Sequence, residues 1–385
     1  MEKIVQEYER HFARFFGIER ALAFWKGRVA LYALLRALEI GDGDEVILPG
    51  YTCVMNVNPI KYVGARPIYV DIEPETFNMN VSLLKEKITD KTKVIIAQHT
   101  YGYPCQMDAI MNIAKSRGIA VIEDCCLAFG SRYKGKMVGT FGLAGYFSSQ
   151  WNKPYTTGLG GMAITGDTKL AERIESLRAD DMCPPSGREV LILSAQLMIY
   201  RLFVYPRTTA LAQRLFRYLS SKGAAVGSSS ASEYQPVKAD DFFKGLSKAQ
   251  ARSGLRGLKR IDHNIAHRLS MALRYDRLLG DRGLKGRSYD GGIMRPVMVR
   301  YPLRIREKTK ALEQAAREGI ELGSWFECPL HPIETPLASY DYRVGMCPEA
   351  EKAAREVVNL PLHPRANEQT VQRSVDFIIR FTHAG

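Results

Sequence analysis

The sequence from Phe147 to Gly161 reads FSSQWNKPYTTGLGG and contains Lys153 between hydroxyl residues and a glycine-rich return. It follows Asp124, which ends the short, mainly apolar run that begins at Val121. A lysine supplies an amine that can bond to an aldehyde, and an aspartate can keep a ring nitrogen protonated so that the ring draws electrons. Together the two residues predict a site for pyridoxal 5'-phosphate.

Neither residue carries this prediction alone. A lysine in a loop rich in glycine and threonine is usually a solvated side chain, and an aspartate at the end of a strand often caps the next helix. The prediction depends on further motifs that follow one another along the chain. They are GRVAL at 27–31, GDGDEVILP at 41–49, VGARPIYVD at 63–71, HTYGYP at 99–104 and LPLHP at 360–364.

From near Phe15 to near Val375, these motifs and their order resemble the DegT/DnrJ/EryC1/StrS family of sugar aminotransferases. The resemblance implies an enzyme of fold type I that depends on pyridoxal phosphate. It also implies an α/β fold with a large, mainly parallel-sheet domain and a smaller C-terminal α/β domain. The family works as a homodimer with both active sites at the interface, so we expect the same assembly here.

The resemblance also assigns roles to individual residues. Lys153 is expected to bind the cofactor and to move the proton between substrate and cofactor, and Asp124 to hold the pyridine nitrogen. Ser148 and Gly27 match positions that bind the cofactor's phosphate. Arg28 stands where a small hydroxyl residue is usual, so only its backbone donor is expected to take part.

Three positions depart from the family pattern. Cys53 aligns with an aromatic residue that commonly stacks on the pyridine ring, and Leu127 aligns with a glutamine. Residues 243–245, Phe-Lys-Gly, align with the Asn-x-Arg that a partner subunit offers to the phosphate. These departures bear on the substrate and the reaction more than on cofactor binding. Four further residues are candidates for the substrate pocket, although packing alone explains such side chains: Tyr51, Trp151, Tyr155 and His331.

With 385 residues the chain exceeds what one hydrophobic core usually supports, and we expect two domains. The first, 1–245, is the large cofactor-binding domain with an atypical insertion over about 183–232; the second, 246–385, contains a linking helix and the small domain. The charged opening decapeptide lacks the apolar core of a signal peptide, which predicts a cytoplasmic protein.

A net charge of +13 predicts attraction to polyanions: nucleic acid, an anionic membrane or a phosphate-bearing substrate. A surplus of solvated lysine and arginine explains the charge equally well. The sequence contains no nucleic-acid-binding motif, and a nucleotide-linked sugar is the phosphate-bearing substrate that the resemblance implies. The seven cysteines form no C-x-x-C pair and show no metal-ligand spacing with the histidines, so we expect neither disulfides nor a metal site.

Apolar periodicity predicts an N-terminal helix over 3–16 and then alternating strands and helices up to Asp124. This alternation predicts a mainly parallel sheet with function at the carboxyl ends of its strands. Beyond it we expect one long helix from Leu246 to about Leu279. The C-terminal part should contain a strand over 296–303 and helices over 307–318, 348–358 and 368–381.

The stretch 190–205 is apolar except for Ser194, Gln196 and Arg201, and is longer and less polar than the family's usual segment. It is too short and too polar for a membrane span. A helical hairpin that packs on its own dimer explains it. An interfacial helix that rests on an anionic membrane is the alternative, through five basic residues: Arg201, Arg207, Arg214, Arg217 and Lys222.

The sequence therefore predicts an aminotransferase that converts a keto group on a nucleotide-linked sugar to an amine, with an amino acid such as glutamate as donor. One alternative is a dehydratase or another non-transaminating enzyme, which the presence of Lys153 disfavours. The other is a non-catalytic scaffold of the same fold at a membrane surface, suggested by Leu127, Cys53 and the insertion.

Overall fold

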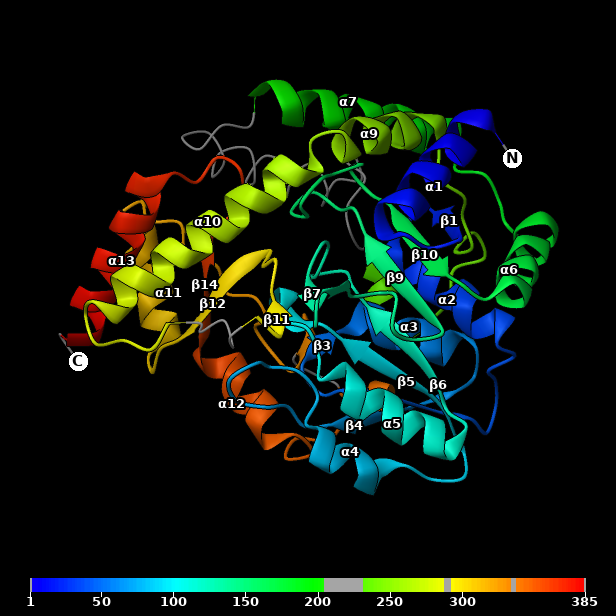
Figure 1. Ribbon diagram of the computed structural model, residues 1–385, viewed down its shortest axis with the longest axis horizontal. Coiled ribbons are helices and arrows are strands. Elements are labelled where there is room, and N and C mark those ends of the chain that lie inside the picture. The colour runs from blue at the N-terminus through cyan, green and yellow to red at the C-terminus, as the bar shows by residue number, and fades with distance from the viewer. Residues whose placement is uncertain (1, 204–230, 287–291, 334–336, 384–385) are drawn as a thin grey trace.

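A computed structural model describes residues 2–203, 231–286, 292–333 and 337–383 (Figure 1). Its centre is a seven-stranded sheet with the order β1-β10-β9-β6-β5-β2-β4. The five strands from β9 to β4 run parallel, whereas β10 and β1 are antiparallel to their neighbours. The predicted α/β fold with a mainly parallel sheet is confirmed. In sheet order the strands are Arg20–Phe24, Gly161–Thr165, Ala144–Ser148, Ala120–Asp124, Thr92–Gln98, Glu45–Pro49 and Arg66–Val70.

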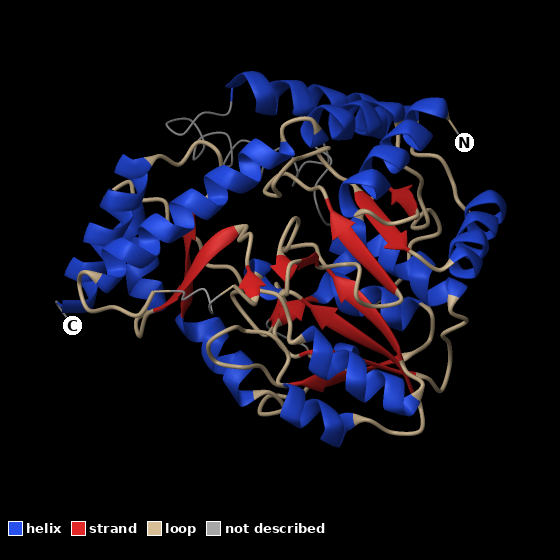
Figure 2. Ribbon diagram, viewed as in Figure 1, coloured by secondary structure: helices blue, strands red, loops and turns tan. Residues whose placement is uncertain are grey.

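Helices cover both faces of this sheet (Figure 2). They are α1 (Lys3–Phe16), α2 (Gly27–Ala37), α3 (Val54–Tyr62), α4 (Val81–Lys87), α5 (Met107–Arg117) and α6 (Thr168–Asp180). Successive residues of a strand point to opposite faces, so a strand covered on both sides must be apolar throughout. In β5, Val94 and Ile96 join the core on the α2 and α3 side, while Ile95 joins the core on the α1 and α5 side. This two-sided burial explains why the strands read as continuous apolar runs.

The C-terminal part forms a third hydrophobic core around an antiparallel pair, β12 (Arg300–Arg304) and β14 (Val357–Pro361). Helices α10 (Ile261–Gly280), α11 (Lys308–Arg317) and α13 (Glu368–His383) contribute to that core. Two expectations were wrong here. The strand predicted over 296–303 begins at Arg300, and the helix predicted over 348–358 ends at Glu356 as α12 (Pro348–Glu356). The chain leaves the helix there because Val357 and Val358 pair with β12, and β-branched side chains suit a strand.

The single long helix predicted from Leu246 is also wrong, because the chain breaks into α9 (Lys248–Leu258) and α10 (Ile261–Gly280). Ser247 caps α9 in a capping box with Gln250, and Arg260 precedes α10 with a non-helical ψ of 7°. The break lets α9 lie on α1 while α10 continues toward the C-terminal part (Figure 1). The predicted division of the chain at residue 245 stays a prediction.

Helix α7 (Gly187–Phe203) lies within the atypical insertion and begins three residues before the apolar stretch that starts at Val190. Residues 204–230, including Arg207, Arg214, Arg217 and Lys222, lie outside the described residues. Among the helices that the structure describes, none has both the length and the hydropathy needed to cross a bilayer.

Candidate active site

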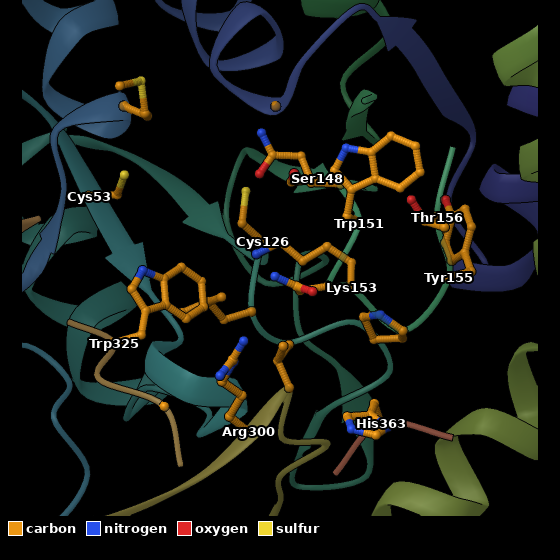
Figure 3. Close-up of a pocket in the computed structure, with 18 of the residues that line it drawn as sticks. Cys53, Cys126, Ser148, Trp151, Lys153, Tyr155, Thr156, Arg300, Trp325 and His363 are labelled. Atoms are coloured by element: carbon orange, nitrogen blue, oxygen red, sulfur yellow. The ribbon is translucent and has the colours of Figure 1, made fainter. Parts of the chain in front are cut away.

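A cavity of about 1110 Å³ opens beyond the carboxyl ends of β5 and β6, where function is expected in a parallel sheet. Its walls come from segments that are distant in the sequence: the start of α2, the loop that follows β9, one face of α7, and residues of the C-terminal part. Figure 3 shows Lys153 and Cys126 near its centre, with Trp325 to the left and Arg300 and His363 below. The structure thus brings both residues of the predicted catalytic pair to one cavity.

Asp124 is held in a fixed orientation by a buried network. One carboxylate oxygen accepts a hydrogen bond from the Asn56 side-chain amide at 2.7 Å, and the other accepts from the Cys126 backbone amide at 2.9 Å. Asn56 in turn accepts from the Tyr146 hydroxyl at 3.0 Å. Each carboxylate oxygen has room for a second donor. Asp124 can therefore receive a further N–H from a group in the cavity.

Lys153 is half-buried in a turn, where its backbone amide donates to the Gln150 carbonyl oxygen at 3.0 Å. The Lys153 Nζ is 5.2 Å from the centre of the Trp325 ring. Burial lowers the pKa of Lys153, and the positive charge of Arg300 acts in the same direction. Asp124 opposes this lowering. The net effect increases the fraction of neutral amine, which is the form that bonds to an aldehyde.

The predicted phosphate-binding residues meet at the start of α2. Gly27 is the first residue of this helix, and a Cβ there would lie 3.2 Å from both the Phe147 carbonyl oxygen and the Ser148 Cβ. Backbone amides in the first turn of a helix have no acceptor within the helix and bind anions. The cavity therefore fits pyridoxal phosphate, with amide donors and the Ser148 hydroxyl for the phosphate, Asp124 for the ring nitrogen and Lys153 for the aldehyde.

The Arg28 side chain is turned away from this role. Its guanidinium forms a buried ion pair with Glu233, and Lys26 contacts the same carboxylate at 3.2 Å. Burial lowers the pKa of Lys26 to about 8, and Arg28 acts in the same direction. The guanidinium is thus engaged by Glu233, and binding of the phosphate by the Arg28 backbone stays a prediction.

The other departures from the family pattern are also visible. Cys53 and Leu127 both line the cavity. Cys53 lies in β3 (Thr52–Cys53), which pairs with β13 (Leu330–His331) and so places Cys53 beside His331. Lys244, in the Phe-Lys-Gly segment, is bound to Glu189 at 2.8 Å and to Asp241 at 2.6 Å. It stabilises the start of α7.

Of the four weaker candidates, Trp151, Tyr155 and His331 line the cavity. The Tyr155 hydroxyl hydrogen-bonds to the Tyr8 hydroxyl in the core, so this residue presents its ring and not its oxygen. Burial lowers the pKa of His331 to about 4, which keeps its imidazole neutral near pH 7.

Tyr51 is a correction. It is fully buried behind Phe326, with ring centres 5.0 Å apart and its hydroxyl 2.9 Å from that of Tyr101, and it is not part of the cavity wall. The Tyr51 ring is held in the core by aromatic contacts with Phe77 and Phe326, whose ring centres lie 6.0 and 5.0 Å from its own.

Sequence reasoning missed several residues of the wall. Asn56 and Gln98 hydrogen-bond to each other at 3.2 Å beside Asp124, and Arg300, Trp325 and His363 approach from the C-terminal part. A signal existed for two of them: Gln98 precedes the HTYGYP motif, and His363 lies inside LPLHP. Arg300 and Trp325 carry no local signal, because only the folding of the C-terminal part onto the sheet brings them to the cavity.

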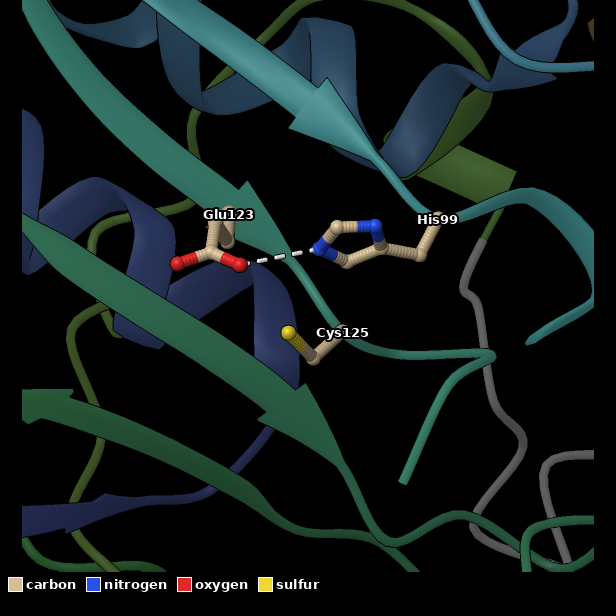
Figure 4. A group of neighbouring side chains, drawn as sticks. All are labelled: His99, Glu123 and Cys125. Carbon is tan, nitrogen blue, oxygen red and sulfur yellow. Dashed lines mark hydrogen bonds and ion pairs between the residues drawn. The ribbon is translucent and has the colours of Figure 1, made fainter. Parts of the chain in front are cut away.

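A second cluster of His99, Glu123 and Cys125 lies beside the site (Figure 4). His99 Nδ1 accepts a hydrogen bond from the Cys105 amide at 2.9 Å, so Nε2 carries the proton and donates to Glu123 at 3.0 Å. Glu123 also accepts three backbone amides, from Gly139, Phe141 and Gly142. These hydrogen bonds engage both ring nitrogens of His99 and both carboxylate oxygens of Glu123, and they fix the strand end that carries Asp124.

The family model of the DegT/DnrJ/EryC1/StrS aminotransferases matches residues 1–190 and 210–378. A GDP-perosamine synthase of Caulobacter vibrioides is 31% identical over 383 residues, which cover 97% of this chain and 88% of that protein. A GDP-perosamine synthase of Escherichia coli O157:H7 is 51% identical over 169 residues, 44% of this chain and 46% of that protein.

Solved structures show the same fold. DesV of S. venezuelae has a TM-score of 0.77 at 24% identity, and the match covers 99% of this chain and 90% of that chain. An aminotransferase from Brucella abortus has a TM-score of 0.76 at 24% identity, with 99% of this chain and 91% of that chain matched.

Proposed function

Because the chain belongs to the DegT/DnrJ/EryC1/StrS aminotransferase family, we propose that it converts a keto group on a nucleotide-linked sugar to an amine, with an amino acid as donor. The observation that carries this proposal is the convergence of the Lys153 amine and the Asp124 carboxylate on one cavity that also contains the start of α2. The matched relatives named as synthases and aminotransferases favour this reaction over the dehydratase and the scaffold.

When bound, pyridoxal phosphate supplies an aldehyde that can hold an amino group and a ring that draws electrons from the carbon bearing that group. Asp124 would hold a proton on the ring nitrogen through an oriented carboxylate. Ser148 and the first amides of α2 would hold the phosphate. Each residue is kept in place by the sheet or by a helix start, so little reorganisation is needed.

Lys153 would hold the cofactor covalently and, once released, would carry the proton between the donor carbon and the cofactor. Its lowered pKa suits this role because an amine that is partly neutral can accept and return a proton. The Trp325 ring lies on one side of the amine, with its centre 5.2 Å from the Lys153 Nζ.

The substrate assignment is supported by charge and by size. A chain of net charge +13 attracts the diphosphate of a nucleotide-linked sugar, and a cavity of about 1110 Å³ is large enough for such a ligand. The names of the two GDP-perosamine synthases support a sugar linked to a nucleoside diphosphate. We also propose that the chain acts in the cytoplasm as a homodimer, as its family resemblance implies.

A second proposal concerns α7, which carries an exposed apolar stripe. Leu191, Met198, Ile199 and Leu202 are 72, 58, 51 and 54% exposed, and they recur on one side of the helix. The sequence from 190 to 232 contains five basic residues and no acidic residue. We propose that this stripe rests on an anionic membrane surface, because apolar burial and positive charge act together there.

The aminotransferase proposal is tested by labelling. The purified protein should absorb visible light, and borohydride should attach the cofactor to one peptide that contains Lys153. The Lys153→Ala variant should lose both signals, while Lys248→Ala, an exposed lysine on α9, serves as the control. Addition of L-glutamate should shift the cofactor spectrum of the wild type. A label on another lysine, or no spectral change with any amino donor, contradicts the proposal.

A further inference from the structure

Arg300, the first residue of β12, carries a positive charge that no ion pair neutralises among the described residues. Within the part of the chain that the structure describes, its side chain forms no hydrogen bond and no ion pair shorter than 4.0 Å. Figure 3 shows it extending into the cavity with Trp325 on one side and His363 on the other. Burying a guanidinium without a negative partner costs free energy, which a ligand that carries a negative charge would offset.

An acidic group in the same cavity wall does not fill this role. Glu321 also lines the cavity, but its carboxylate accepts a hydrogen bond from His363 Nε2 at 2.9 Å. Burial lowers the pKa of Arg300, and the negative charge of Glu321 only partly opposes this effect. The guanidinium therefore remains available to an anion in the cavity.

Two neighbouring residues hold Arg300 in this position. The buried Arg268 donates to the carbonyl oxygens of Met298 at 3.2 Å and Val299 at 2.8 Å, which fixes the backbone immediately before β12. Gly323 leaves space for the guanidinium, because a Cβ there would lie 2.4 Å from Arg300 Nη1. Arg300 thus extends from a fixed strand, and its guanidinium lies against Gly323.

We propose that Arg300 binds the α-carboxylate of the amino donor, an inference that rests on the proposed function. The guanidinium pairs with carboxylates through two parallel hydrogen bonds, and its planar shape suits this geometry. The side chain lies close enough to Lys153 for its charge to act on that amine. A carboxylate bonded directly to the reacting carbon must lie next to the amine that exchanges with it.

A phosphate of the sugar substrate is the other anion that could reach the cavity. The sugar ring separates that phosphate from the keto carbon, so the phosphate must bind farther from Lys153 than a carboxylate on the reacting carbon does. The position of Arg300 near Lys153 therefore favours the donor. The experiment separates these two sources with one probe for each.

The test uses the enzyme loaded with pyridoxal phosphate. L-Glutamate and its α-amide, L-isoglutamine, are compared in the amino-donor half-reaction, and binding of GDP is measured by calorimetry as the phosphate probe. The variants are Arg300→Gln, Arg300→Lys and Gly323→Ala, with Arg256→Gln on exposed α9 as the charge-matched control. Gly323→Ala retains the charge of Arg300 but displaces its guanidinium. The dissociation constant of 2-oxoglutarate provides a readout that does not depend on turnover.

In Arg300→Gln, the loss of a hydrogen-bonded charge pair should lower the affinity for glutamate and for 2-oxoglutarate about 10- to 100-fold. The affinity for GDP should not change. The preference of the wild type for glutamate over isoglutamine should disappear. Arg300→Lys should recover part of it, and Gly323→Ala should resemble Arg300→Gln. Unchanged donor affinity, or a loss confined to GDP, overturns the proposal. If Arg300→Gln does not fold, Gly323→Ala decides alone. Failure of the wild type to react with any donor instead contradicts the proposed function.

Discussion

Asp124 illustrates how one residue combines a structural and a chemical constraint. Its carboxylate is buried and accepts hydrogen bonds from Asn56 and from the Cys126 amide. These donors fix the orientation of the carboxylate at the cavity wall. An oriented carboxylate at a strand end is suited to hold a protonated ring nitrogen. The neighbouring Glu123, bound to His99 and three backbone amides, points to the other face and fixes the strand.

At the same scale we predict the effect of Asp124→Asn. The neutral side chain can no longer hold a proton on the ring nitrogen, so transamination should slow on the order of 10²-fold or more, as expected for the loss of an oriented electrostatic partner. One of the two donors that face the carboxylate will meet an N–H group, which should lower the free energy of unfolding by about 1–3 kcal/mol. Single-turnover rates and urea denaturation measure the two effects. A rate equal to that of the wild type would assign the ring nitrogen to another acid.

Helices α1 and α9 pack so closely that one position of α9 must be glycine. Gly254 of α9 faces the Tyr8 ring of α1, and a Cβ at Gly254 would lie 2.4 Å from that ring. The Tyr8 hydroxyl hydrogen-bonds to Tyr155 in the loop that contains Lys153. The Tyr8 side chain therefore connects the contact between α9 and α1 to the loop that contains Lys153.

From this packing we predict that Gly254→Ala destabilises the protein by about 1–3 kcal/mol, because the added methyl group displaces a fully buried ring. The matched control is Gly187→Ala in α7, where a Cβ meets no atom within 4 Å. This control should be neutral or slightly stabilising, since alanine favours a helix over glycine. Thermal and urea unfolding compare the two variants. Equal stability of Gly254→Ala and the wild type would mean that α1 and α9 separate more easily than their contacts indicate.

On the scale of the whole molecule, α7 has two apolar sides. Leu193 and Leu197 pack against Trp25 and Leu159 on the body of the protein, while Leu191 and Leu202 face solvent. A helix that is apolar on all sides is normally covered on all sides. The described residues leave the outer stripe of α7 uncovered, and the charge of the surrounding sequence favours an anionic surface as its cover.

We predict that the protein co-sediments with vesicles that contain phosphatidylglycerol at low salt and is released as salt rises. Each basic group near an anionic surface contributes about 1 kcal/mol, and salt screens this attraction. The triple variant Leu191→Gln, Met198→Gln, Leu202→Gln should bind less, and uncharged phosphatidylcholine vesicles are the lipid control. A wild type that stays in solution at low salt contradicts the membrane proposal. A triple variant that light scattering shows to be monomeric, where the wild type is a dimer, means that the stripe packs on a second copy.

The sequence alone determined the sheet and singled out Lys153 and Asp124 as the predicted catalytic pair. Strand burial on both faces produces continuous apolar runs, so the alternation of strands and helices up to Asp124 is a local pattern that can be read along the chain. The motifs around Lys153 and Asp124 are equally local. Their roles in binding pyridoxal phosphate stay predictions until the label is mapped.

Only the tertiary structure decided the rest of the cavity. Arg300 and Trp325 reach it because the C-terminal part folds against the sheet, and Tyr51 leaves its wall because the ring of Phe326 covers it. The end of α12 at Glu356 depends on pairing between Val357 and Arg304, which are far apart in the sequence. The break between α9 and α10 similarly depends on packing against α1. In each case the deciding contact joins residues that no local pattern connects, so the free energy that fixes them arises only when the chain is folded.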